Sequence, residues 1–328
     1  GMSGAAQNHW PKIFSEERRR RTFSGEFGKF PGRVLLARLL TMVILASAMA
    51  ACTPSLERGR LLNVSVPTGD SGPYAERPVL VYLPEVSVRS RTPALLTLHG
   101  YGSNPLDNLR RTGLVQRPSR PGGGTTGIAV EYGWIVAAPY GSAPGDPTGC
   151  QSAQAPCAWN AGGWSTQAAA NRSDVDFLAR VAAYLAEHAC ARADGTFATG
   201  FSAGAMMAQR LACEAPAAVF RGVAPMEGSV VLGGDFHGCA PRQQVGAWLD
   251  FCGSDDGVCQ AAEFGSLGQN ASFALFGARC KGGVVSTYTT PTTTCEAHTG
   301  CPGGALVERC GILGLGHEIS GHGGKQGW

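Results

Sequence analysis

Ser202 lies at the centre of Gly200-Phe201-Ser202-Ala203-Gly204, a Gly-x-Ser-x-Gly pentapeptide. This spacing is typical of a sharp turn between a strand and a helix, which lifts a serine hydroxyl above the edge of a sheet where it can act as a nucleophile. Residues 197–199 and 203–214 supply the strand and the helix that the turn requires. The sequence therefore predicts that Ser202 is a nucleophile, and an exposed serine in a plain strand–turn–helix is the alternative.

A nucleophilic serine of this kind needs a histidine base, which follows both the serine and the acid in the chain. Of the seven histidines, those at positions 9, 99 and 188 precede Ser202, His237 precedes the candidate acids, and His298 is predicted to lie in a Cys/Thr-rich loop. His317, in a Gly-rich loop after the last predicted strand, is the predicted base. His322, five residues further on, remains the alternative.

Two aspartates are candidates for the acid that orients the histidine. Asp255 and Asp256 directly follow the predicted strand 245–251, within Cys252-Gly253-Ser254-Asp255-Asp256. The carboxylate would accept a hydrogen bond from Nδ1 of His317, so that Nε2 faces Ser202. The residues alone leave both aspartates open, and a solvated turn is the competing interpretation.

Backbone N–H groups are expected to bind the negative oxygen that forms when the serine attacks. The segment Leu98-His99-Gly100-Tyr101-Gly102 follows the predicted strand 94–98. We expect the N–H groups of Tyr101 and Ala203 to form this oxyanion hole, and such donors are worth about 2.7–4 kcal/mol each. His99 is predicted to be a structural residue of the loop.

Strands and helices alternate along the part of the chain that must position these residues. The apolar patterns predict strands at 79–84, 94–98, 133–139, 197–199, 222–226, 245–251 and 307–312, and helices at 171–189 and 203–214. Ser173, with Asp176 three residues later, is typical of a helix start. This alternation indicates an α/β fold with a mostly parallel central sheet and helices on both faces. With no repeat or linker in the sequence, residues 53–328 are predicted to form a single catalytic domain.

Several of these segments together resemble the secreted polyhydroxybutyrate-depolymerase and feruloyl-esterase family of α/β-hydrolases. In chain order they are Leu95–Gly102, Pro139–Gly141, Trp159–Trp164, Ala198–Cys213, Ala224–Gly228, Gly253–Asp256 and Gly314–His317, within about residues 60–320. The resemblance implies an α/β-hydrolase fold with Ser202 as nucleophile and His317 as base. The family's Gly-Thr-x-Asp acid motif, laid on Gly253–Asp256, selects Asp256.

The same resemblance implies that carboxylic esters are hydrolysed through an acyl-enzyme, with no metal and no organic cofactor. The implied substrates are polyhydroxyalkanoate-like esters or feruloyl and acetyl esters of plant polymers. Trp159 and Trp164 are expected to contact the substrate near Tyr101, while bracing of a long loop is the alternative. The sequence departs from the family at Cys252, where His is usual, and at Glu318-Ile319, where Trp-Pro is frequent. A serine peptidase or lipase of this fold and a non-catalytic surface-binding protein are the other functional hypotheses.

The first 52 residues are predicted to be an export signal preceded by a disordered extension. An apolar run at 34–51, flanked by Arg33 and interrupted by Arg38, ends in Ala50-Ala51-Cys52, which resembles a bacterial lipoprotein cleavage box. Cys52 is therefore the predicted lipidation site, with a transmembrane anchor as the alternative. The protein is expected to be secreted or held at the cell surface by a lipid anchor.

Composition restricts the partners and the compartment. Net charge is +3, and part of it lies in the four arginines at 18–21. Without that run the chain is close to neutral, so a nucleic-acid-binding surface is not expected. The 12 cysteines lack the spacing of a zinc site and indicate disulfides formed in an oxidising compartment. Cys150–Cys157 and Cys252–Cys259 are predicted pairs, the second clamping the turn that carries Asp256. An ester substrate, in polymeric form for the family, is the expected partner, and the sequence does not give the oligomeric state.

Overall fold

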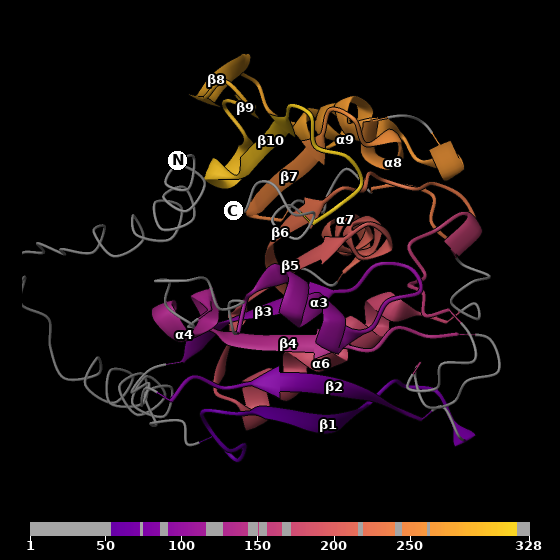
Figure 1. Cartoon of the computed structure of the whole chain (residues 1–328), viewed down its shortest axis with the longest axis vertical. Coiled ribbons are helices and arrows are strands. Elements are labelled where there is room, and N and C mark those ends of the chain that lie inside the picture. Colours follow the sequence, from indigo (N-terminus) through magenta and orange to yellow (C-terminus); the bar gives the residue numbers. More distant parts are fainter. Residues whose placement is uncertain are drawn as a thin grey trace, which may run out of the picture. The chain divides into compact units, whose positions relative to one another are not determined.

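A ten-stranded, mostly parallel sheet forms the centre of the described structure (Figure 1). The structure is a computed structural model that describes residues 54–72, 75–85, 91–115, 127–143, 150, 156–165, 172–215, 219–239, 245–260 and 263–319. All of these belong to one compact unit, Thr53–Ile319. The predicted export signal, Cys52 and His322 lie outside the described residues.

The strands follow the order β1-β2-β4-β3-β5-β6-β7-β10-β9-β8 across the sheet. The strands from β4 to β10 in this order are parallel, whereas β1, β2, β8 and β9 pair antiparallel at the two edges. Their bounds are β1 Leu61–Pro67, β2 Glu76–Tyr82, β3 Thr92–Leu98, β4 Ile135–Pro139, β5 Ala191–Phe201, β6 Phe220–Met226, β7 Ala247–Gly253, β8 Val284–Thr289, β9 Thr293–His298 and β10 Leu306–Ile312.

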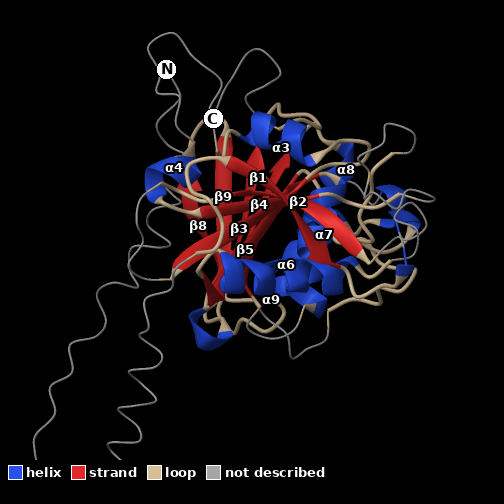
Figure 2. Ribbon diagram, turned by 90° about the horizontal axis from the view of Figure 1, so that it is seen from below, coloured by secondary structure: helices blue, strands red, loops and turns tan. Residues whose placement is uncertain are grey.

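Helices cover both faces of the sheet, as the sequence predicts (Figure 2). Alternate residues of β2 show the two faces: Val79 and Val81 pack in the cluster that contains α6 and α7, whereas Leu80 and Tyr82 pack with α3 and α4. The helices are α3 Pro105–Thr112, α4 Ile128–Tyr132, α6 Asp174–His188, α7 Ala203–Glu214, α8 Gly257–Gln260 and α9 Gly268–Gly277, with 3-10 turns η4 Glu263–Gly265 and η5 Pro302–Gly304.

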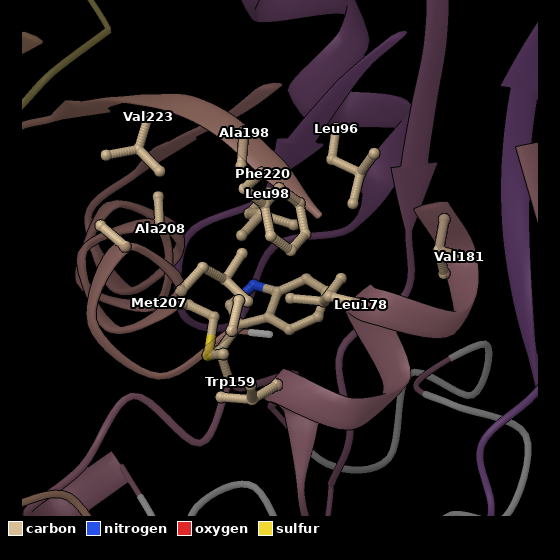
Figure 3. Packing of buried hydrophobic residues seen from close by; sticks show 14 of the residues in the cluster. Leu96, Leu98, Trp159, Leu178, Val181, Ala198, Met207, Ala208, Phe220 and Val223 are labelled. Carbon is tan, nitrogen blue, oxygen red and sulfur yellow. The ribbon is translucent and has the colours of Figure 1, made fainter. Parts of the chain in front are cut away.

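The larger core lies between the sheet and helices α6 and α7 (Figure 3). Leu96 of β3, Leu178 of α6 and Met207 of α7 are fully buried there, and the ring of Trp159 packs among them. The helix start predicted at Ser173 is present, because its hydroxyl accepts a hydrogen bond from the N–H of Asp176. This core fixes α7 against β5, and therefore the turn between them.

The strand predictions need correction at one boundary and at two omissions. Strand β5 extends from Ala191, well before the predicted 197–199, because Ala191 pairs with Thr92 of β3 before a shift of register. The antiparallel strand β1 and the β8–β9 hairpin were not predicted, and His298 ends a strand rather than lying in a loop. The residues of β8 are mostly exposed, so the hairpin has no alternating apolar pattern to reveal it.

Five disulfides join pairs of described residues. The predicted pairs Cys150–Cys157 and Cys252–Cys259 are present, and three more join Cys213 to Cys239, Cys280 to Cys301 and Cys295 to Cys310. The last two fasten the β8–β9 hairpin to its surroundings. Among the described helices, none has the length and apolar character needed to cross a membrane.

Candidate active site

The turn between β5 and α7 holds Ser202 in a strained backbone conformation. Ser202 has φ 56° and ψ −120°, a region that residues other than glycine rarely adopt. A side chain at Gly200 would collide with the backbone of Gly204, and one at Gly204 would collide with the carbonyl groups of Leu98 and His99. The two glycines of the pentapeptide are therefore required for the helix to start this close to β3 and β5.

His317 connects Ser202 to Asp256 through two hydrogen bonds. Its Nε2 atom lies 2.9 Å from Oγ of Ser202, and its Nδ1 atom lies 2.8 Å from Oδ2 of Asp256. The imidazole also packs on the ring of Phe201, 4.9 Å between centroids. The side chain of His317 is 34% exposed while that of Asp256 is fully buried. The arrangement can therefore pass a proton from the serine to a histidine that is open to solvent on one side.

The structure brings Asp256, and not Asp255, to His317. Asp256 Oδ1 accepts a 2.7 Å hydrogen bond from the N–H of Val258, so both of its oxygens have donors. Burial by itself would raise the pKa of Asp256, but hydrogen bonds from His317 and Glu227 outweigh it and hold that pKa below its usual value. Asp255 is exposed and accepts from the hydroxyl of Ser254 instead. The Cys252–Cys259 disulfide spans the turn that presents Asp256.

The two predicted oxyanion donors flank contacts with the nucleophile: Ala203 follows Ser202 directly, and a Cβ at Gly100, which precedes Tyr101, would lie 3.5 Å from Cβ of Ser202. Ala203 is the first residue of α7, where N–H groups have no partner within the helix and the helix dipole is positive. Among the hydrogen bonds of the described residues, no acceptor is recorded for the N–H of Ala203 or of Tyr101. The loop of Tyr101 is anchored because Gly102 donates to the carbonyl of Cys157.

His99 and Trp159 hold this loop in place through buried hydrogen bonds. His99 is fully buried, and its Nε2 accepts from the N–H of Gly141 at 3.0 Å while its Nδ1 lies 2.8 Å from the carbonyl of Gly100. This pattern assigns the neutral tautomer with the proton on Nδ1. Burial lowers the pKa of His99 to about 4. The expected structural role of His99 is therefore consistent with its surroundings.

The prediction that Trp159 contacts the substrate does not fit its burial. Its side chain is fully buried, and its Nε1–H donates to the carbonyl of His99. Trp164 is different, because it is 36% exposed and its ring meets Tyr101 edge-on at 5.6 Å. Phe264, which the sequence analysis missed, is 62% exposed and lies 6.3 Å from Trp164. Tyr101, Trp164 and Phe264 form a row that we call the aromatic surface.

Comparisons with known proteins agree with this architecture. Neither the protein-family models nor the curated protein sequences give a match to the chain. Among solved structures, an acetyl xylan esterase from Aspergillus awamori is similar, with TM-score 0.50 and 17% identity over 81% of this chain and 96% of that chain. An S-formylglutathione hydrolase from Agrobacterium tumefaciens has TM-score 0.50 and 16% identity over 79% of this chain and 88% of that chain.

The chain has the α/β-hydrolase fold. In a parallel sheet of this kind the carboxyl ends of neighbouring strands meet at one edge. The segments that follow β5, β6, β7 and β10 accordingly carry Ser202, Glu227, Asp256 and His317. The sequence analysis identified three of these four residues and gave no role to Glu227.

Glu227 supplies a second carboxyl next to the acid turn, our name for residues 253–256, which lie at the carboxyl end of β7 in the α/β-hydrolase sheet and carry Asp256. It is 2% exposed, has φ 57°, and its Oε2 accepts from the N–H of Gly253 at 2.9 Å. Its carboxyl also hydrogen-bonds that of Asp256. A buried residue with positive φ is a signal of function, but this conformation is not visible in the sequence.

Two groups of described residues bring three atoms of metal-ligand type together. They are Glu227 with Cys252 and Cys259, and Glu308 with Cys295 and Cys310. In each group the two cysteines are joined in a disulfide. A cysteine binds a metal as its thiolate, so in this oxidised form neither group offers its sulfurs to a metal.

Proposed function

We propose that this protein is a serine esterase that hydrolyses carboxylic esters through an acyl-enzyme intermediate. The observation that supports the proposal is the hydrogen-bonded series from Ser202 through His317 to Asp256, with distances of 2.9 and 2.8 Å. The strained backbone of Ser202 is a second support, because such strain is maintained at functional sites.

In the proposed reaction, Oγ of Ser202 attacks the ester carbonyl and His317 accepts its proton on Nε2. Asp256 holds the imidazole ring through Nδ1 and stabilises the imidazolium that forms. The N–H groups of Tyr101 and Ala203 bind the oxyanion of the tetrahedral intermediate. His317 then protonates the leaving alcohol, and a water molecule releases the acyl group by the same steps in reverse.

We further propose that the substrate is an ester carried by a polymer, either a feruloyl or acetyl ester of a plant polymer or a polyhydroxyalkanoate. The support is the aromatic surface of Tyr101, Trp164 and Phe264. Its exposed rings begin at Tyr101, whose N–H is the proposed oxyanion donor. Aromatic rings can stack on a feruloyl group or pack against an aliphatic chain. Trp159 has no part in this proposal.

Export of the protein is proposed on the same footing. The disulfides support it, because such bonds persist in secreted and periplasmic proteins and are rare in the cytosol. Lipidation at Cys52 remains part of the proposal, and mass spectrometry of the mature N-terminus would test it.

A fluorophosphonate probe tests the enzymatic proposal directly. The wild type should be labelled and should hydrolyse p-nitrophenyl acetate, and Ser202→Ala should abolish both. A wild type that is neither labelled nor active would support a non-catalytic binding protein instead. A panel of methyl ferulate, acetylated xylan, hydroxybutyrate oligomers, a long-chain triglyceride and a peptide anilide would then identify the substrate class. Preference for the last two would point to a lipase or a peptidase.

A further inference from the structure

The segment Met226–Gly228 begins at the last residue of β6. It contacts the turn that carries Ser202 and the turn after β7 that carries Asp256. On one side, Ser202 donates its N–H to the carbonyl of Met226 at 3.0 Å, and a Cβ atom at Gly228 would lie 2.6 Å from the carbonyl oxygen of Ser202. On the other side, Glu227 donates its N–H to Phe251 in β7 at 2.8 Å. The segment is therefore placed to set the distance between the two turns.

With the positive φ of Glu227, its side chain lies against the acid turn. There Oε2 accepts the N–H of Gly253, and Sγ of Cys259 lies 3.2 Å away. Since Cys259 is joined to Cys252, its sulfur has no proton to donate and this is a packing contact. Glu227 thus contacts both the backbone and the disulfide that hold Asp256 in place.

The hydrogen bond between the carboxyls of Glu227 and Asp256 requires a proton, because two carboxylates can only accept. Asp256 accepts from Nδ1 of His317 and from the N–H of Val258, which favours its ionised form. Glu227 is almost fully buried and accepts one backbone N–H, from Gly253. The donor sets therefore assign the shared proton to Glu227.

We propose that Glu227 is a positioning residue that acts as a neutral carboxylic acid, donating its proton to Asp256 and thereby fixing the acid that orients His317. This role rests on the proposed function, because it concerns the same catalytic site. Glu227 does not touch the reacting atoms; it acts through Asp256.

The electrostatic surroundings agree with a neutral Glu227. Burial and the neighbouring Asp256 raise the pKa of Glu227 to about 10, although the N–H of Gly253 opposes the shift. The charged groups that act on it are the carboxyls of Asp256 and of Asp250 on β7, and both disfavour a further negative charge. Because the folded pKa lies above the unfolded value of 4.5, the stability associated with protonated Glu227 is complete below pH 4.5 and is lost as the pH rises towards 10.

Two substitutions separate this role from simple packing. Glu227→Gln keeps an oxygen to accept from Gly253 and an N–H to donate to Asp256, whereas Glu227→Leu keeps only the bulk. Glu308→Gln is the matched control, because Glu308 is also buried, on β10, but accepts a hydrogen bond from the hydroxyl of Thr287. The measurements are the pKa of His317 by ring ¹⁵N NMR, kcat and KM on p-nitrophenyl acetate, and the melting temperature between pH 5 and pH 10.

We expect Glu227→Gln and Glu308→Gln to leave the pKa of His317 unchanged. In Glu227→Leu, Asp256 loses a donor and becomes more basic, so the pKa of His317 should rise by about one unit. The kcat of Glu227→Leu should fall about tenfold while KM stays within about twofold, the loss of one hydrogen bond to a charged group. The melting temperature of Glu227→Gln should fall less than that of the wild type between pH 5 and pH 10.

The sign of the His317 shift decides the proposal. If Glu227 is ionised, Gln and Leu both remove a negative charge and both lower the pKa of His317, which overturns the inference. Should Glu227→Leu fail to fold, the His317 pKa and the pH-dependent stability of Glu227→Gln still decide it. A wild type without Ser202-dependent esterase activity would refute the proposed function, while the NMR and stability results would continue to judge Glu227 separately.

Discussion

Removing the Cys252–Cys259 disulfide should cost the protein more activity than its loss of stability alone explains. The bond closes a short loop, with a sequence separation of 7, that carries Asp256. For a loop of this length the chain-entropy relation gives about 2.4 kcal/mol of stabilisation. Without the bond the turn gains freedom, and Asp256 is held to His317 only by its own hydrogen bonds.

A second disulfide supplies the control. Cys280–Cys301 has a sequence separation of 21, so its removal should cost more stability, about 3.3 kcal/mol by the same relation. It joins the ends of the segment that contains the β8–β9 hairpin and does not span the turn that carries Asp256. The double substitution Cys280→Ala/Cys301→Ala should therefore be the less stable protein and keep its kcat.

Urea unfolding and p-nitrophenyl acetate kinetics on the two double variants make the comparison. We expect Cys252→Ala/Cys259→Ala to lose at least about tenfold in kcat at a temperature where it is fully folded, a change of about 1.4 kcal/mol in the barrier. This is less than the roughly 10⁴-fold loss that follows complete removal of a triad acid's function. Equal kcat values for the two folded variants would refute the idea that the disulfide positions Asp256.

Other substitutions test the remaining parts of the site. Asp256→Asn should reduce kcat by roughly 10³- to 10⁴-fold while Asp255→Asn stays within about twofold, and comparable losses would reopen the choice of acid. Burial lowers the folded pKa of His99 from its ordinary value of 6.5 to about 4, so its contribution to stability is present above pH 6.5 and should be lost as the pH falls through 4. Melting of wild type and of His99→Gln as a function of pH measures this loss. Trp164→Ala and Phe264→Ala should each raise KM for methyl ferulate severalfold and leave KM for p-nitrophenyl acetate unchanged, since only the larger acyl group reaches the aromatic surface. Unchanged KM for methyl ferulate would remove that surface from the proposed site.

Local sequence determined the features that depend on steric rules within a few residues. Gly200 and Gly204 predicted the turn at Ser202, because no larger side chain fits between β3, β5 and α7. The run of buried residues in β3 and the hydroxyl of Ser173 at the start of α6 were likewise readable from the residues. Two of the disulfides were also predicted, each between cysteines with a sequence separation of 7, although sequence alone cannot fix the pairing of twelve cysteines.

Only the tertiary structure decided how residues distant in the chain share one site. The residue types alone left Asp255 and Asp256 open, and a family resemblance favoured Asp256. The turn after β7 points Asp256 at His317 and leaves Asp255 in solvent. Trp159 and Trp164 are five residues apart, yet one is fully buried and the other exposed. Glu227 lies in no recognised pattern of catalytic residues, because its role depends on the parallel pairing of β6 with β7 and on a backbone angle that no residue type specifies. The sequence thus contains the chemical groups, and the long-range pairing of the strands determines which of them meet.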